Sequence, residues 1–149
     1  MRRARSYYRK VSDDPQSKTP PLTLEQIGQL LPGTGEIMAS VGNAWWKCAY
    51  AARGGNWELA AYFARRVRGL QRKLAQIRPK YAEDLVAFDT EHLTPLLTAL
   101  GAHHGPSFER AYAIATARAN ELHVKWAKPY IRWVLPDEPP KDLDLEVDR

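Results

Sequence analysis

Apolar residues recur at every third or fourth position along most of this chain, which is the spacing of amphipathic helices. The clearest stripe, in residues 57–78, steps alternately by three and four, as along the seam of an antiparallel bundle. Its members are Ala60, Phe63, Val67, Leu70, Leu74 and Ile77. A second stripe, in residues 35–53, consists of Ile37, Val41, Trp45, Cys48 and Ala52. The pattern predicts two long helices separated by "RGGN", where a glycine ends the first helix and Asn56 caps the second.

Two further segments are also predicted to be helical. Residues 81–103 keep the helical period as far as Phe88. Pro95 disfavours a helix interior, so Thr94 is expected to cap a new helix with Pro95 at its first position. Residues 108–128 contain the last stripe, which consists of Phe108, Ala111, Ala115, Ala119, Leu122 and Trp126.

Shorter segments flank these helices. Before them, Thr23 and Gln26 have capping-box spacing in "TLEQIGQLL", which predicts a short helix. After them, "YIRWVLPDEPP" (residues 130–140) is predicted to continue as an extended apolar strap. The connections between the long segments are short, and no segment alternates as a strand does. The sequence therefore predicts an all-α protein, an antiparallel four-helix bundle with a short N-terminal helix and an extended C-terminal strap.

Charge is distributed unevenly and distinguishes the two ends of the chain. Residues 1–22 are basic and proline-rich and are predicted to form a flexible arm. Residues 136–149 contain six Asp/Glu and two Lys/Arg and are predicted to form an acidic tail. Residues 23–135 between them are the predicted bundle domain. The length of 149 residues, with 44% hydrophobic and 26% charged residues, is typical of one soluble globular domain.

The sequence favours the cytoplasm over a membrane or an exported location. No apolar run is long enough to span a bilayer, and the basic N-terminus lacks the apolar core of a secretory signal. Cys48 is the only cysteine, which excludes an internal disulfide and a cysteine-based zinc site. Because Cys48 lies on an apolar stripe, it is expected to be a buried, unreactive thiol.

No arrangement of residues indicates an enzyme or a metal site. The sequence has no phosphate-binding loop after a strand and no Glu-x-x-His motif of the kind that builds di-iron sites in bundles. His92 lies near a predicted helix end, and His103 and His104 lie in a glycine-flanked turn. These positions favour capping or solvation over metal binding. We therefore interpret the protein as non-catalytic, with no predicted metal ligands.

Two stretches nevertheless resemble a known family. "NWELAAYFARRVRGLQRKLAQIRP" and "FERAYAIATARANELH...PYIRWVLP" are similar to the second and fourth helices of small bacterial bundle proteins related to cytochrome c-prime. The resemblance covers about residues 33–140. In haem-bearing relatives the fourth helix carries a Cys-x-x-Cys-His box, whose cysteines fall here on Ala119 and Leu122 and whose histidine falls on His123. The resemblance therefore implies a bundle without covalent haem, in which His123 could still bind haem non-covalently.

The residues around His123 form the candidate ligand pocket. A neutral imidazole in a bundle can bind haem iron without any cysteine if the bundle leaves a cavity. The candidate lining consists of His123, Ala119, Leu122, Trp126, Tyr112 and Trp45. The small alanines of the last helix would leave room for a small apolar or porphyrin-like ligand. In the alternative interpretation His123 is a boundary residue, and the neighbouring aromatic side chains fill the former haem volume.

A basic region offers a second hypothesis. Residues 53–80 contain eight Lys/Arg and one Glu. The candidate basic patch consists of Arg65, Arg68, Arg72 and Lys73. The three arginines lie on the predicted face opposite Phe63 and Leu70, and Lys73 flanks that face. It could neutralise the phosphates of a nucleic acid, but no helix-turn-helix or other reading motif is present, which favours an acidic protein partner or a solvated face. Trp133 and the apolar strap around it also suggest a surface for a homo-oligomer or a protein partner.

Overall fold

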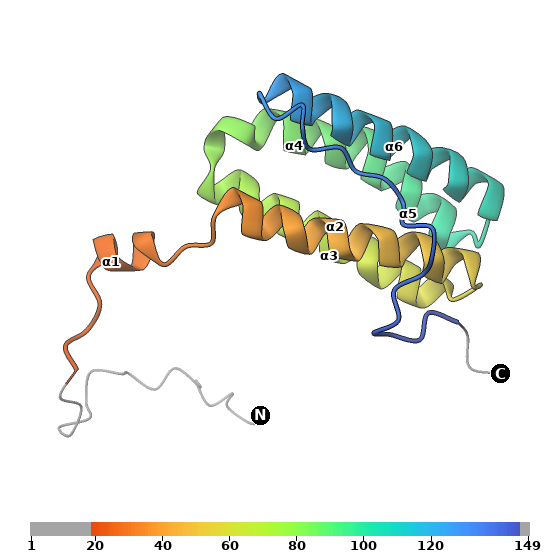
Figure 1. Cartoon of the computed structure of the whole chain (residues 1–149), viewed down its shortest axis with the longest axis horizontal. Helices are drawn as coiled ribbons and strands as arrows, with labels where there is room; N and C mark the ends of the chain where they lie inside the picture. The colour runs from red at the N-terminus through yellow and green to blue at the C-terminus, as the bar shows by residue number, and fades with distance from the viewer. Residues whose placement is uncertain (1–18, 147–149) are drawn as a thin grey trace, which may run out of the picture. The chain divides into compact units, whose positions relative to one another are not determined.

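The computed structural model of the chain describes residues 19–146 (Figure 1). Within these residues every regular element is a helix and none is a strand, which confirms the prediction of an all-α protein. The chain divides into two units, with the boundary between Leu31 and Pro32. Residues 1–18 of the predicted basic arm lie outside the described residues.

The first unit contains the predicted short helix, α1 (Leu24–Gln29). Both hydrogen bonds of its capping box are formed. The Thr23 hydroxyl accepts from the Gln26 backbone N–H at 3.1 Å, and the Gln26 side chain accepts from the Thr23 backbone N–H at 2.8 Å. Two N–H groups that the helix itself cannot pair are thereby satisfied, which is why so short a helix begins here.

The second unit begins with the two long helices that the sequence predicted, α2 (Thr34–Arg53) and α3 (Trp57–Ile77). Gly55 between them has φ of 77°, a left-handed conformation that favours glycine. Asn56 caps α3, since its side-chain oxygen accepts from the Leu59 backbone N–H at 3.2 Å. The two helices make the most extensive helix–helix contact in the unit. Most of the predicted seam is buried, with Val41 and Val67 almost fully enclosed, whereas Leu70 and Ile77 are partly buried.

Residues 79–101 form one nearly continuous helical segment. In order, it consists of a 3₁₀ turn (Pro79–Tyr81), α4 (Ala82–Phe88), a π turn labelled η3 (Asp89–Leu93) and α5 (Thr94–Gly101). A new α-helix does begin at Thr94, but the predicted capping role of Thr94 is wrong, because Leu93 and Thr94 both have helical backbone angles and no side-chain cap bond forms. Thr94 therefore caps nothing, and its hydroxyl donates to the Asp89 carbonyl at 3.1 Å.

The π turn explains why Pro95 does not break this segment. In an α-helix a proline ring clashes with the carbonyl four residues before it. In η3 the Thr94 backbone N–H instead donates to the Asp89 carbonyl, five residues before it. This bond places one extra residue in the turn directly ahead of Pro95, which then falls in the first turn of α5, where a proline is tolerated. The helix can then continue into α5.

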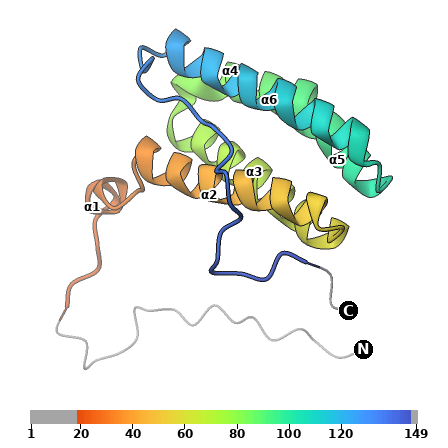
Figure 2. The same ribbon diagram turned by 45° about the vertical axis from the view of Figure 1, so that its right-hand side comes forward.

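The last helix, α6 (Gly105–Lys125), begins three residues earlier than the sequence predicted. The reason is His104, whose Nδ1 accepts from the Ser107 backbone N–H at 3.2 Å and so acts as the N-cap. The helix also ends before residue 128, because Ala127 has φ of 57° and leaves the helical conformation. Helices α2 to α6 pack together as a bundle around an apolar core (Figures 1 and 2).

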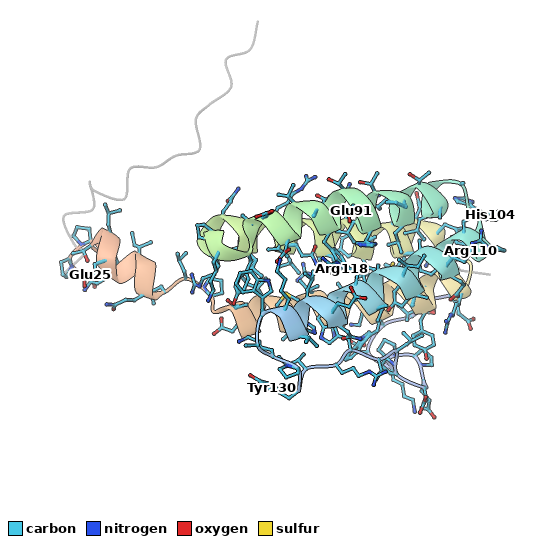
Figure 3. The ribbon with its side chains drawn as sticks, turned by 90° about the horizontal axis from the view of Figure 1, so that it is seen from above. Glu25, Glu91, His104, Arg110, Arg118 and Tyr130 are labelled. Atoms are coloured by element: carbon cyan, nitrogen blue, oxygen red, sulfur yellow. The ribbon has the colours of Figure 1, made fainter. Side chains whose placement is uncertain are left out.

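The strap returns from the end of α6 across α2 (Figure 1). Asn120 on α6 holds it by two hydrogen bonds, donating to the Trp133 carbonyl at 3.0 Å and accepting from the Trp133 backbone N–H at 2.7 Å. The Trp133 indole lies against Gly42 of α2, where a side chain would come within 3.4 Å of the ring. Tyr130, by contrast, points away from the helices (Figure 3).

The described part of the acidic tail also packs on α2. Asp142 accepts from the Lys47 ammonium at 2.5 Å, and Leu145 is buried. The Tyr50 hydroxyl donates to the Pro136 carbonyl at the start of the tail. Within residues 19–146, no helix is both long and apolar enough to cross a membrane.

Candidate functional site

A cavity of about 300 Å³ lies at the end of the bundle where α2 and α4 begin and α3 and α6 end. It is partly open to solvent. Its apolar lining consists of Met38, Ala39, Leu74, Leu85, Phe88, Ala119, Leu122, Trp126, Ile131 and Trp133. The polar side chains on its wall are few, which is typical of a site for a largely apolar small molecule.

Four of the six candidate pocket residues line this cavity, and they all come from the end of α6 or just beyond it. They are Ala119, Leu122, His123 and Trp126. Trp45 and Tyr112 do not line it. Their rings stack on each other in the core with centroids 4.5 Å apart, and the Tyr112 hydroxyl donates to the Trp45 carbonyl at 3.1 Å. The structure therefore separates these two residues from the other four.

His123 is held by one of its two ring nitrogens. Nδ1 lies 3.1 Å from the Ile131 carbonyl oxygen of the strap. Because a carbonyl can only accept, Nδ1 carries the hydrogen, and Nε2 of the neutral ring keeps its lone pair. Burial lowers the pKa of His123 below its usual value, opposed by the hydrogen bond to Ile131, so the ring is neutral at pH 7. Among the described residues, the only hydrogen bond of the ring is the one at Nδ1, and the ring meets that of Trp133 edge-on with centroids 5.5 Å apart.

The Trp126 side of the cavity is fixed by a carboxylate. Asp84 on α4 accepts from the Trp126 indole N–H at 2.8 Å and from the Lys125 ammonium at 2.8 Å. The bond from Lys125 is the main reason that the pKa of Asp84 is lowered. The Tyr81 ring meets Trp126 edge-on, with centroids 4.7 Å apart. Both carboxylate oxygens are thus occupied, and the indole is held in one orientation.

Gln71 on α3 is a cavity residue that the sequence analysis missed. Its side chain lines the cavity and is only 6% exposed. No atom of the described residues is placed to form a hydrogen bond with its Oε1. A clue was present in the sequence, because Gln71 lies four residues after Val67 and three before Leu74, in the middle of an apolar stripe. A polar residue at such a position is buried and needs a partner.

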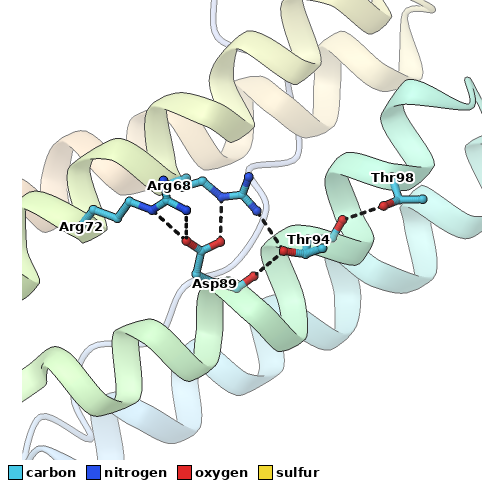
Figure 4. Close-up of polar contacts among 5 residues, drawn as sticks. All are labelled: Arg68, Arg72, Asp89, Thr94 and Thr98. Carbon is cyan, nitrogen blue, oxygen red and sulfur yellow. Dashed lines mark hydrogen bonds and ion pairs between the residues drawn. The ribbon is translucent and has the colours of Figure 1, made fainter.

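Two of the four residues of the candidate basic patch are paired with a carboxylate. Arg68 and Arg72 both bind Asp89 of the π turn, at 2.7 Å and 2.9 Å (Figure 4). Arg68 also donates to the Thr94 hydroxyl at 3.0 Å. Arg65 and Lys73 remain exposed on α3. One carboxylate therefore neutralises part of the patch, and Arg68 is directed toward the π turn.

Cys48 is buried in the apolar core, and His103 packs on an aromatic ring. Burial raises the pKa of Cys48 to about 12, which keeps the thiol protonated. His103 stacks on Trp57 with centroids 5.4 Å apart. Across residues 19–146, no three His, Cys, Asp or Glu side chains come together as metal ligands would.

Comparison of the chain with protein-family models, with curated proteins and with solved structures gives no match.

Proposed function

We propose that this protein is a non-catalytic, cytoplasmic binding protein that takes a small apolar or porphyrin-like ligand into the cavity beside His123. In this proposal the bundle is an antiparallel four-helix bundle similar to cytochrome c-prime-type proteins, with residues 79–101 as its third helix. No haem is attached covalently, because Ala119 and Leu122 replace the two cysteines of the attachment box.

The observation that supports the proposal is the arrangement of the two nitrogens of His123. The strap carbonyl of Ile131 fixes Nδ1, while Nε2 keeps an unpaired lone pair on a side chain that lines the cavity. Histidines that bind a metal almost always donate their second N–H to a carbonyl, a carboxylate or water in this way. Nε2 is therefore the atom that would contact haem iron or the polar group of another ligand.

The size and lining of the cavity support a compact apolar ligand. Its volume of about 300 Å³ lies at the lower end of the range of small-molecule sites. Aromatic side chains on several sides, among them Phe88, Trp126 and Trp133, offer flat apolar surfaces. A ring as large as a porphyrin would fill the cavity and extend through its open side.

Titration with haemin tests the proposal directly. In the wild-type protein, ligation by Nε2 shifts and sharpens the Soret band to that of histidine-bound haem. His123→Asn retains an amide N–H that can donate to Ile131 but has no Nε2, and we expect it to lose the shifted band while remaining folded. His123→Ala loses both groups and should lose the band as well.

His103→Asn is the matched control, because it removes an imidazole outside the cavity and asparagine tolerates the left-handed backbone at this position (φ 52°). The control should bind haemin as the wild type does. An absent Soret shift in the wild type, or one that His123→Asn leaves unchanged, would remove haem ligation by His123.

A further inference from the structure

Among the described residues, no group pairs with the ammonium of Lys128, although this side chain is partly buried. Within residues 19–146, every other Lys or Arg that is buried or partly buried binds an oxygen through its side chain. The pairs are Lys47 with Asp142, Arg68 with Asp89, Arg118 with Glu121, and Arg78 with the Ile77 carbonyl. A cation that is partly removed from water is stabilised by such a partner. The Lys128 ammonium can therefore still pair with an anion that comes from outside.

Lys128 also lines the 300 Å³ cavity. Among the described residues of the cavity wall, only Asp84 and Lys128 carry a full charge at pH 7, because His123 is neutral. The two oxygens of Asp84 already bind Lys125 and Trp126. The negative charge on the wall is thus balanced, whereas the positive charge of Lys128 is not, and the wall favours an anion.

The backbone on both sides of Lys128 is fixed at the cavity. The Lys128 N–H donates to the His123 carbonyl at 2.7 Å, and the Lys128 carbonyl accepts from the Ile131 N–H at 3.0 Å. Both of these partners line the same cavity. The turn between α6 and the strap therefore keeps Lys128 beside His123, and only the flexible end of its side chain has to adjust to a ligand.

We infer that the ligand of this cavity is an aromatic carboxylic acid, whose ring lies among the apolar side chains and whose carboxylate pairs with the Lys128 ammonium. This inference rests on the proposed function, since it concerns the same cavity. The flat side chains of Phe88 and Trp126 support the aromatic ring, and the unpaired Lys128 supports the acid. Because the cavity is partly open, the carboxylate can keep part of its hydration while the ring is buried.

Two probes of nearly the same shape separate the charge from the ring. Cinnamate and cinnamamide share a flat ring and side chain, and end in a carboxylate and a neutral amide respectively. Calorimetric titration of the full chain at pH 7 gives the ratio of the two affinities, and the wild type should bind cinnamate more tightly. Lys128→Met keeps the apolar stem and removes the ammonium. We expect the cinnamate-to-cinnamamide ratio to fall by about tenfold in this variant, the effect of one hydrogen bond to a charged group.

Two further variants distinguish a local pair from a change in net charge. Lys141→Met removes the same charge from a side chain that is 87% exposed and lies outside the cavity. This matched control should leave the affinity ratio unchanged. Lys128→Arg retains a cation at the cavity and should keep most of the preference for cinnamate.

The outcomes distinguish this inference from the proposed function. If neither haemin nor either probe binds the wild type, the proposed function itself is wrong. If haemin binds but cinnamate does not, or cinnamate binds no better than cinnamamide, the cavity is a ligand site and the inference is overturned. A preference for cinnamate that Lys128→Met leaves unchanged also overturns it, because the Lys128 ammonium then stays in solvent. If Lys128→Met does not fold, Lys128→Gln provides the same comparison.

Discussion

The two ring nitrogens of His123 have different surroundings in the structure. Nδ1 ties the end of α6 to the strap through Ile131, and Nε2 stays available. Desolvation lowers the pKa of the ring, which keeps it neutral where a free histidine would begin to gain charge. The same desolvation makes folding sensitive to pH.

The sign of this pH dependence follows from the lowered pKa. The unfolded chain gains a proton at about pH 6.5, whereas the folded protein gains it only at a lower pH. Between these values the unfolded state binds more protons, so the free energy of unfolding decreases as the pH falls from 7. Urea titrations of the wild type and His123→Asn between pH 7 and pH 5 should show a smaller decrease in the variant. If the free energy of unfolding decreased equally with falling pH in the wild type and in His123→Asn, the burial of this ring would be contradicted.

At the scale of single elements, the π turn organises the contact between α3 and the α4–α5 segment. The wider turn brings the Asp89 carboxylate between two arginines of α3, and the backbone carbonyl of the same residue binds Thr94 (Figure 4). A turn that accommodates Pro95 thus also creates an ion-pair site between helices.

The two arginines should contribute unequally to this site. The Arg68 side chain is 23% exposed, whereas that of Arg72 is 66% exposed. Asp89→Asn should lower the free energy of unfolding by about 1–3 kcal/mol, because it leaves Arg68 without its carboxylate in a partly buried position. Double-mutant cycles with Arg68→Met and Arg72→Met should give the larger coupling for Arg68, since exposed pairs contribute about 0–1 kcal/mol. A larger coupling for Arg72 would contradict this assignment.

At the scale of the whole second unit, residues 129–146 belong to the folded structure. The strap closes one side of the cavity through Ile131 and Trp133, and the acidic tail covers part of α2. The tail supplies the carboxylate for Lys47, whose side chain is only 8% exposed. A charge buried to this extent requires a partner.

Removing that partner should destabilise the protein more than removing an exposed tail charge. Asp142→Asn leaves the Lys47 ammonium without a carboxylate, so thermal unfolding should occur at a lower temperature. Asp137→Asn, which removes an exposed charge from the same tail, is the matched control and should have little effect. Lys47→Met combined with Asp142→Asn should restore the stability. If Asp137→Asn lowered the unfolding temperature as much as Asp142→Asn does, the change in net charge would explain both effects and the pairing with Lys47 would not.

The candidate site could be predicted only in part from the sequence, and particular residues show why. Ala119, Leu122 and His123 lie on one helix and Trp126 directly follows its end, so helical spacing brings the four together whatever lies opposite. Tyr112 and Trp45 come from different helices, and only the packing of α6 against α2 placed them in a stack away from the cavity. Gln71 was detectable as a polar residue in an apolar stripe, but its missing partner was not.

Sequence alone determined α1, α2 and α3, because periodic apolar positions, the Thr23 capping box, Gly55 and Asn56 act within a few residues of one another. Tertiary structure decided where the cavity lies, which nitrogen of His123 is free and which arginines are neutralised. These features depend on atoms from segments far apart in the chain, such as Ile131 against His123 and Asp89 against Arg68. Local periodicity specifies which face of a helix is apolar, but the neighbour that covers that face is chosen by packing in three dimensions.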